Sequence, residues 1–205
     1  MVLLDVERFA EPLRRCFNVQ FVLDYVLDRT LSIHDTRLGN VQLMNWNAGH
    51  LEIAAQRGFH DEFLNFFERV KIEDASACAR ALRNRGSVII DDVLSDERFA
   101  PCCSVLRRAG ISAVQSTPLV SSSGALVGML STHFSAPHRP TEAQMSVTME
   151  AARLAANAII RLRANARDDR CLRSNAMALL RQSRQAIANA DKLLTGKTGD
   201  GRLNS

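Results

Sequence analysis

The alternation of apolar and polar residues is most regular between residues 113 and 134, where it predicts two antiparallel strands joined by a turn at 120–124. One face of this hairpin is mostly apolar. The other face carries small, hydroxyl and imidazole side chains: Val114, Ser116, Pro118, Met129, Ser131 and His133. Two such unlike faces are typical of strands with a helical layer behind them and a partly polar hollow in front.

Helical spacing and shorter alternating runs predict the other elements. Helices are expected at 19–33, from Asp61 to Val70, from 74–76 to Gly86, at 101–109 and from Thr141 onward, and strands at 40–47, 51–57 and 87–91. The strand at 40–47 is expected to have partners on both sides. Asp61 is expected to cap its helix, and Pro12 to bend or restart an N-terminal helical arm.

The C-terminal part has a seven-residue pattern, in which residues three and four apart form one seam along a helix. The seam runs from Ala151 to Leu193. Asn165 and Asp169 place polar groups on it, so a bend or boundary is expected near them. The predicted parts are an N-terminal arm at 1–17, one domain at 18–163, and a C-terminal helix at 164–205 with a disordered tail from residue 196.

Composition and charge limit the classes of function. The chain has 205 residues, 46% of them hydrophobic, and a net charge of +4, which suits one sizeable core. Basic and aromatic residues do not alternate as on a base-stacking surface, so no nucleic-acid partner is expected. No apolar run approaches the roughly 18 residues of a membrane span, and no signal peptide is visible. We therefore expect a cytoplasmic protein without a membrane partner.

The cysteines form an odd set without a Cys-x-x-Cys pair: Cys16, Cys78, Cys102, Cys103 and Cys171. This pattern favours reduced thiols over a disulfide framework or a zinc site. We expect no metal and no cofactor, and leave open the identity and existence of a small ligand.

A series of short motifs occurs in one order along the chain: Asp92-Val93, DERF at 96–99, Gly110-Ile111, AVQSTPL at 113–119, Gly124, GMLSTH at 128–133 and PHRP at 137–140. This ordered set resembles the GAF domains of bacterial sensor proteins, especially those attached to histidine kinases, over about residues 18–163. The resemblance implies an α+β, GAF/PAS-like fold. Its antiparallel sheet of about six strands would have helices on one face and a ligand pocket on the other. It also implies a homodimer through the terminal helices and a partner such as a histidine kinase.

Activities of related branches fit the residues poorly. Cys78 stands where free-methionine-sulfoxide reductases carry a catalytic cysteine, but Ala79 replaces the glycine after it, and no resolving cysteine lies between Trp46 and Ala77. The helix at 101–106 lacks the histidine of bilin-binding members, and the Asn-Lys-x-Phe signature of cyclic-nucleotide-binding members is absent. No kinase domain follows in this chain, so a non-enzymatic protein is expected.

His133 is the principal candidate on the polar face, since it matches the pocket histidine that phytochromes carry on the equivalent strand. Three roles remain open for it: a histidine satisfied within the core, a ligand contact, or a metal or haem ligand. The candidate pocket residues are His133, Ser131, Ser116, Met129, Val114, Phe99 and Cys78. The aromatic residues at 59–67 either pack the core or wall this pocket, and the two roles are compatible.

A second polar group consists of Asp91 and Asp92, at the end of a predicted strand. Paired acids act as a general acid and base or as a cation site. They also cap turns or pair with an arginine such as Arg98, which is the structural role that the sequence favours here.

Two classes of function follow. The first is a non-enzymatic sensory module, which binds a small, mostly apolar ligand or acts as a dimeric scaffold in a two-component pathway. The alternative is a thiol-based redox enzyme or sensor that uses Cys78 or the Cys102-Cys103 pair.

Overall fold

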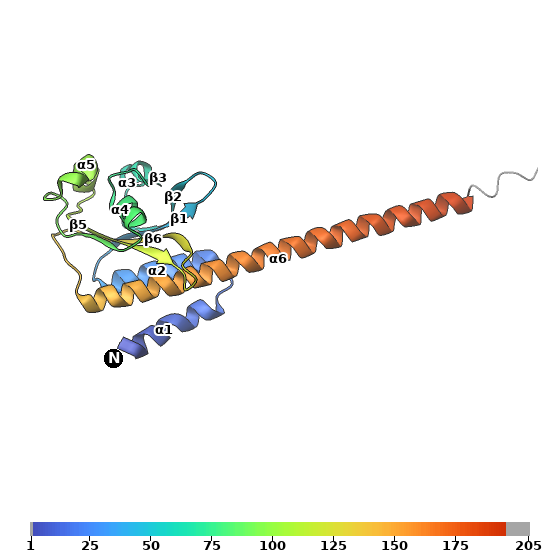
Figure 1. Ribbon diagram of the computed structural model, residues 1–205, viewed down its shortest axis with the longest axis horizontal. Coiled ribbons are helices and arrows are strands. Elements are labelled where there is room, and N and C mark those ends of the chain that lie inside the picture. Colours follow the sequence, from blue (N-terminus) through green and yellow to red (C-terminus); the bar gives the residue numbers. More distant parts are fainter. Residues whose placement is uncertain (1, 196–205) are drawn as a thin grey trace, which may run out of the picture. The chain divides into compact units, whose positions relative to one another are not determined.

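The computed structural model describes residues 2–195, and the side chains of residues 9–184. Its helices are α1 (Val2–Arg15), α2 (Val19–Ile33), α3 (Asp61–Phe66), α4 (Ala77–Asn84), α5 (Ala100–Arg108) and α6 (Glu142–Thr195), with a short 3₁₀ helix at Glu97–Phe99 (Figure 1). Its strands are β1 (Leu38–Asn45), β2 (His50–Arg57), β3 (Arg69–Lys71), β4 (Val88–Ile90), β5 (Ala113–Val120) and β6 (Leu126–Phe134). The chain divides into two units, residues 1–162 and 163–205. The domain limits predicted from the sequence stay predictions.

The first unit is built on one six-stranded sheet with the order β3-β2-β1-β6-β5-β4. Every neighbouring pair is antiparallel, which confirms the predicted α+β fold. Strand β1 lies between β2 and β6, as its pattern predicted. Pro118 lies beyond the three residues of β5 that pair with β4, where its missing N–H leaves that ladder intact.

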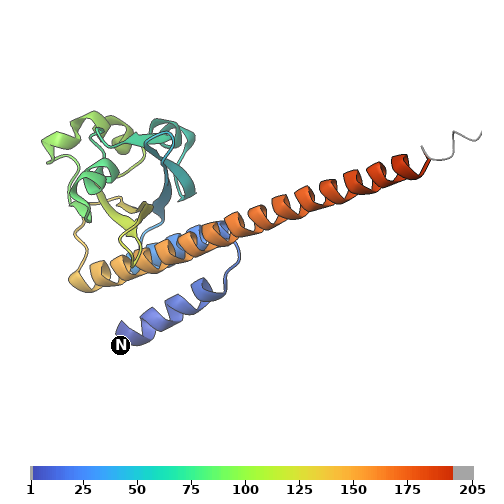
Figure 2. The same cartoon turned by 45° about the vertical axis from the view of Figure 1, so that its right-hand side comes forward.

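One face of the sheet is covered by α2 and by the first part of α6, which lie side by side (Figures 1 and 2). Helix α2 has the predicted limits, and it begins where the Asn18 side chain accepts a hydrogen bond from the Gln20 backbone N–H. It comes very close to β1, because a Cβ at Gly39 would lie 2.7 Å from a methyl group of Leu31. Helix α6 contributes mostly small residues to this layer: Ala151, Ala152, Ala155, Ala156 and Ala158.

Side-chain hydrogen bonds fix α6 at several places along its first part. Near its start, Gln144 Nε2 donates to the Ile33 carbonyl at 3.0 Å, and the His34 ring lies 2.7 Å from the Thr148 hydroxyl. Further along, the side chain of Asn157 donates to the Ser122 hydroxyl in the β5–β6 turn at 2.9 Å. The predicted capping box forms, since Thr141 and Gln144 exchange hydrogen bonds. Helix α6 continues unbroken through residues 165–170, whereas the predicted disordered tail from residue 196 lies outside the described residues.

The other face of the sheet is covered by the short helices α3, α4 and α5 (Figure 1). Two local predictions here were wrong. Asp61 does not cap α3: it is the first helical residue after His60, and there its charge favours the helix N-terminus. Val70 belongs to β3, because α3 ends at Phe66. At the N-terminus, Pro12 lies inside α1 and does not restart it.

Candidate ligand pocket

The floor of the candidate pocket follows from the strand register. Ser131 of β6 lies opposite Asn40 of β1 on one side and Ser116 of β5 on the other. His133 lies one step along the same face and faces Val114 of β5. The sheet therefore presents a polar row, asparagine, serine and serine, next to a row that contains the histidine.

The two serines are bonded to each other and to a thiol above them. Their hydroxyl oxygens are 2.8 Å apart, and Cys78 Sγ lies 3.3 Å from Ser131 Oγ and 3.5 Å from Ser116 Oγ. Cys78 stands in the first turn of α4, whose start is capped by Ser76. These three groups satisfy one another, so the serines hold α4 on the sheet.

His133 is covered by aromatic rings from the segment that leads into α3 and from α3 itself. Phe59 and Phe63 meet its ring nearly at right angles, with centroids 4.9 and 5.6 Å away. Burial lowers the pKa of His133 to about 3, so its imidazole is neutral near pH 7. Its Nδ1 is buried and has no hydrogen-bond partner among the described residues.

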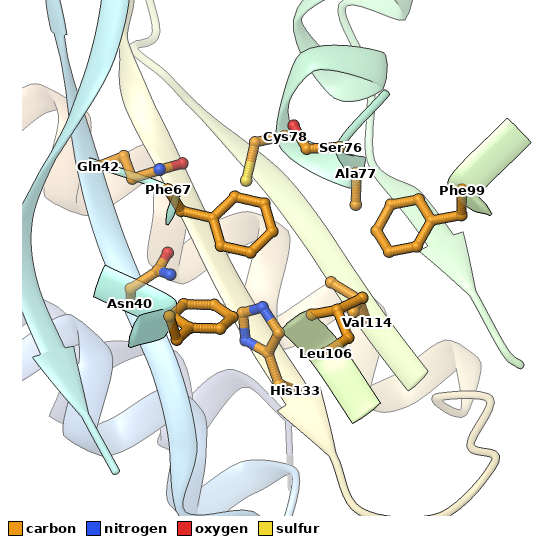
Figure 3. A pocket seen from close by; sticks show the side chains of 11 residues that line it. Asn40, Gln42, Phe67, Ser76, Ala77, Cys78, Phe99, Leu106, Val114 and His133 are labelled. Atoms are coloured by element: carbon orange, nitrogen blue, oxygen red, sulfur yellow. The ribbon is translucent and has the colours of Figure 1, made fainter. Parts of the chain in front are cut away.

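A small cavity of about 20 Å³ lies between this floor and the short helices. It is lined by Asn40, Gln42, Phe63, Phe67, Ser76, Ala77, Cys78, Phe99, Leu106, Val114 and His133 (Figure 3). Within the described residues, Asn40 Oδ1 and Gln42 Oε1 are also buried without a partner. Three residues with an unpartnered polar atom therefore line a space that holds about one water molecule.

The structure brings the predicted pocket residues together on one face. His133, Cys78, Val114 and Phe99 line the cavity, and Ser116 and Ser131 lie directly beneath the Cys78 thiol. Met129 is fully buried in the same apolar cluster, although it does not line the cavity. Whether these residues bind a ligand stays a prediction.

The sequence missed Asn40 and Gln42 as pocket residues. They alternate along β1 like any polar residues of a half-buried strand. Only the pairing of Asn40 with Ser131 and of Gln42 with Met129 shows that they share the face of His133. The information that identifies these two pocket residues therefore lies in the order of the strands in the sheet.

The thiols near the pocket are poorly suited to nucleophilic chemistry. Burial raises the pKa of the Cys78 thiol above its usual range and raises that of Cys102 to about 11, so both are protonated near pH 7. Within the described residues, no group of three or more histidine, cysteine or acidic side chains could hold a metal ion.

The paired acids have structural partners. Asp91 forms an ion pair with Arg139 at 2.9 Å, and the Asp92 carboxylate accepts a hydrogen bond from the Leu94 N–H at 2.9 Å. The capping role agrees with the sequence, but the arginine is Arg139 and not the suggested Arg98.

The sequence profile of the GAF domain family matches residues 18–160. The chain therefore belongs to the GAF domain family. The comparison with curated proteins found no match.

Solved structures with this fold come from several kinds of protein. The GAF domain of an Acinetobacter phosphoenolpyruvate-protein phosphotransferase is 13% identical, covers 82% of this chain and 98% of its own, and has a TM-score of 0.67. A domain assigned to a two-component sensor histidine kinase of Sinorhizobium meliloti 1021 is 19% identical, with coverages of 74% and 97% and a TM-score of 0.61. Free methionine-R-sulfoxide reductase from Neisseria meningitidis is 13% identical, with coverages of 78% and 89% and a TM-score of 0.60.

At these identities the likeness shows the fold alone. The same fold serves both a sensor protein and an enzyme, so the activity has to be argued from the residues of this chain. Among the described residues, no helix is both long and apolar enough to cross a membrane.

Proposed function

We propose that this GAF domain is a non-enzymatic sensory module that binds a small uncharged ligand in the cavity beside His133. The observation that carries the proposal is the group of unpartnered polar atoms on Asn40, Gln42 and His133, all on a face walled by phenylalanine rings. The signal passes to a partner of the two-component type, a proposal supported by the shared fold of a domain assigned to a two-component sensor histidine kinase.

The unpartnered atoms favour a ligand over plain core packing. A buried polar atom without a partner destabilises a fold by about 1–3 kcal/mol, so three of them beside one cavity need a compensating role. A ligand that hydrogen-bonds to them on binding supplies that role. None of the lining residues carries a charged side chain once His133 is neutral, so the favoured ligand is uncharged.

The size of the cavity sets a second condition. A space of about 20 Å³ holds one water molecule, so a larger ligand enters only when the cover moves. Part of the cover is α3, which contributes Phe63 to the lining and is followed at once by Phe67, a second lining residue. It is only six residues long and follows Gly58, whose φ is +79°. We therefore infer that ligand entry displaces α3.

A thiol-dependent reductase is the second candidate, because Cys78 lines the cavity and the Neisseria reductase shares the fold. The raised pKa of Cys78 argues against it, since the thiolate is the reactive form. Turnover of free methionine sulfoxide that disappears in Cys78→Ser would reverse the order of the two candidates.

Native mass spectrometry of freshly purified protein tests the sensory proposal. We expect a bound small molecule in the wild type and its loss in Gln42→Leu. The matched control is Gln115→Leu, because Gln115 is a buried glutamine on the opposite face of the sheet whose Oε1 is also unpartnered. No bound species in the wild type, or equal retention in both variants, would contradict ligand binding at this face.

A further inference from the structure

The net charge of the chain is concentrated in one segment of α6, in the second unit. Residues 163–184 hold six arginines and two aspartates, a net charge of +4, which equals the net charge of the whole chain. The remaining residues therefore carry balanced charges. Every side chain from 164 to 184 is exposed, so the segment presents its charge to solvent. A local excess of one sign is typical of an electrostatic binding surface.

The six arginines share one side of the helix. At about 100° per residue they fall within an arc of about 120°: Arg163, Arg167, Arg170, Arg173, Arg181 and Arg184. Together they form the arginine face. The other residues on this arc are Ala166, Ser174 and Met177, whereas Asp168 and Asp169 lie outside it. The face therefore carries one sign of charge along about 32 Å of helix.

The described part of the chain does not neutralise this face. None of the six arginines forms an ion pair with another described residue. Neighbours on the face are mostly three or four residues apart, where like charges repel and destabilise a helix. Burial and the nearby charge of Arg167 lower the pKa of Arg163. An anionic partner that spans the face would remove this repulsion.

The shape of the face suits a groove of duplex DNA. Ala166 and Ser174 are small and Met177 is unbranched, so a partner can approach the helix axis closely on this side. The helix is exposed all round between 164 and 184, and the major groove of B-form DNA, about 12 Å wide, admits an α-helix. Arginines toward the two edges of the arc then reach phosphates on both sides of the groove. Along about 32 Å a duplex carries about 19 phosphate charges, enough for every arginine.

Other anionic partners fit the face less well. Stacking on single-stranded bases needs aromatic side chains, and residues 163–184 contain none. An acidic helix of another protein, or a membrane surface, would need apolar side chains among the charges that it contacts. The arginine face offers only Met177, because the leucines lie outside the arc: Leu172, Leu179 and Leu180. The observations therefore favour a duplex.

We propose that the arginine face of α6 binds the phosphate backbone of duplex DNA, largely independently of base sequence. Contacts to phosphates supply the sequence-independent part of DNA affinity. The expectation of no nucleic-acid partner rested on the lack of alternating basic and aromatic residues, which stacking on bases requires and backbone contacts do not. The proposal goes beyond the sensory function and does not depend on a ligand in the pocket.

Fluorescence anisotropy of a labelled duplex tests the proposal with the full chain. The duplex has about 20 base pairs, roughly twice the length of the face. Six phosphate contacts predict a slope of about −5 when the logarithm of the affinity is plotted against the logarithm of the salt concentration. We therefore expect binding to weaken about 1000-fold between about 50 and 200 mM salt.

Two triple variants separate the arginine face from net charge. Replacing Arg167, Arg170 and Arg181 by glutamine should reduce the slope by about 3 and weaken binding at about 50 mM salt at least about tenfold. The matched control replaces three exposed arginines of the first unit, none of them in an ion pair, by glutamine: Arg29, Arg98 and Arg107. It removes the same charge and should change the slope by less than about 1. Glutamine and arginine have similar helix propensities, so circular dichroism should show equal helix content in both.

Competitors distinguish the duplex from other polyanions. We expect a single strand of the same length, poly-glutamate and vesicles that contain anionic lipid to bind more weakly than the duplex. Absence of duplex binding at about 50 mM salt, or equal slopes in the two triple variants, would overturn the proposal. So would a single strand, poly-glutamate or vesicles that bind as tightly as the duplex.

Discussion

Replacing Gln42 by leucine separates stability from ligand binding at one residue. Gln42 is 1% exposed, its Oε1 has no partner among the described residues, and it lines the cavity. Leucine has nearly the same size and needs no hydrogen bond. We expect Gln42→Leu to raise the free energy of unfolding of the ligand-free protein by about 1–3 kcal/mol, which raises Tm by about 2–4 °C for each kcal/mol in a chain of this length.

The matched variant Gln115→Leu should have a smaller effect. The Gln115 amide Nε2 donates to Thr117 Oγ1 at 3.2 Å, although its Oε1 is unpartnered. The change to leucine removes one hydrogen bond, which lowers the free energy of unfolding, and one unpartnered carbonyl oxygen, which raises it. The two effects nearly cancel, within about 1 kcal/mol.

Urea unfolding measures both variants, after the protein has been unfolded and refolded to remove any bound species. The same variants are then tested for retention of the bound species. A loss of more than about 1 kcal/mol in refolded Gln42→Leu would refute the reasoning, because it would show that the amide is hydrogen-bonded in the ligand-free state.

Three further outcomes follow from the structure. Burial lowers the pKa of His133 to about 3 and that of His34 to about 4, from 6.5. The unfolded chain therefore binds more protons than the folded chain below pH 6.5, and the free energy of unfolding falls as pH falls. Urea titration should show a shallower dependence of that free energy on pH in His133→Leu. A Cβ at Gly128 would lie 2.0 Å from a backbone oxygen of β1, so Gly128→Ala should cost more than about 3 kcal/mol in urea unfolding. Buried Cys78 should react with iodoacetamide far more slowly than exposed Cys171, and equal rates by peptide mass spectrometry would contradict its raised pKa.

Long elements with a strong period were predictable from the sequence. Helix α2 carries an uninterrupted apolar stripe and a side-chain cap at Asn18, and its limits were found to the residue. The β5–β6 hairpin alternates over enough residues to fix which side chains share the face of His133. Local periodicity was sufficient in both cases.

Short elements and strand order were not predictable in this way. Strand β3 has three residues, which is too few for alternation to distinguish it from the end of α3, so Val70 was placed on the helix. Asn40 and Gln42 reach the pocket through the pairing of β1 with β6, between segments about 90 residues apart. Such a register depends on the whole sheet rather than on any one segment.

The alanine face of α6 limits how a change in the sheet can be absorbed. Ala151, Ala152, Ala155 and Ala156 are at most 2% exposed in the layer behind the strands. An alanine side chain has no rotamer to change, so these four positions cannot repack around a displaced strand. A movement of β6 large enough to open a gap must be followed by the backbone of the helix. The packed interface between β6 and α6 is therefore rigid, so a small shift of the strand moves the whole helix.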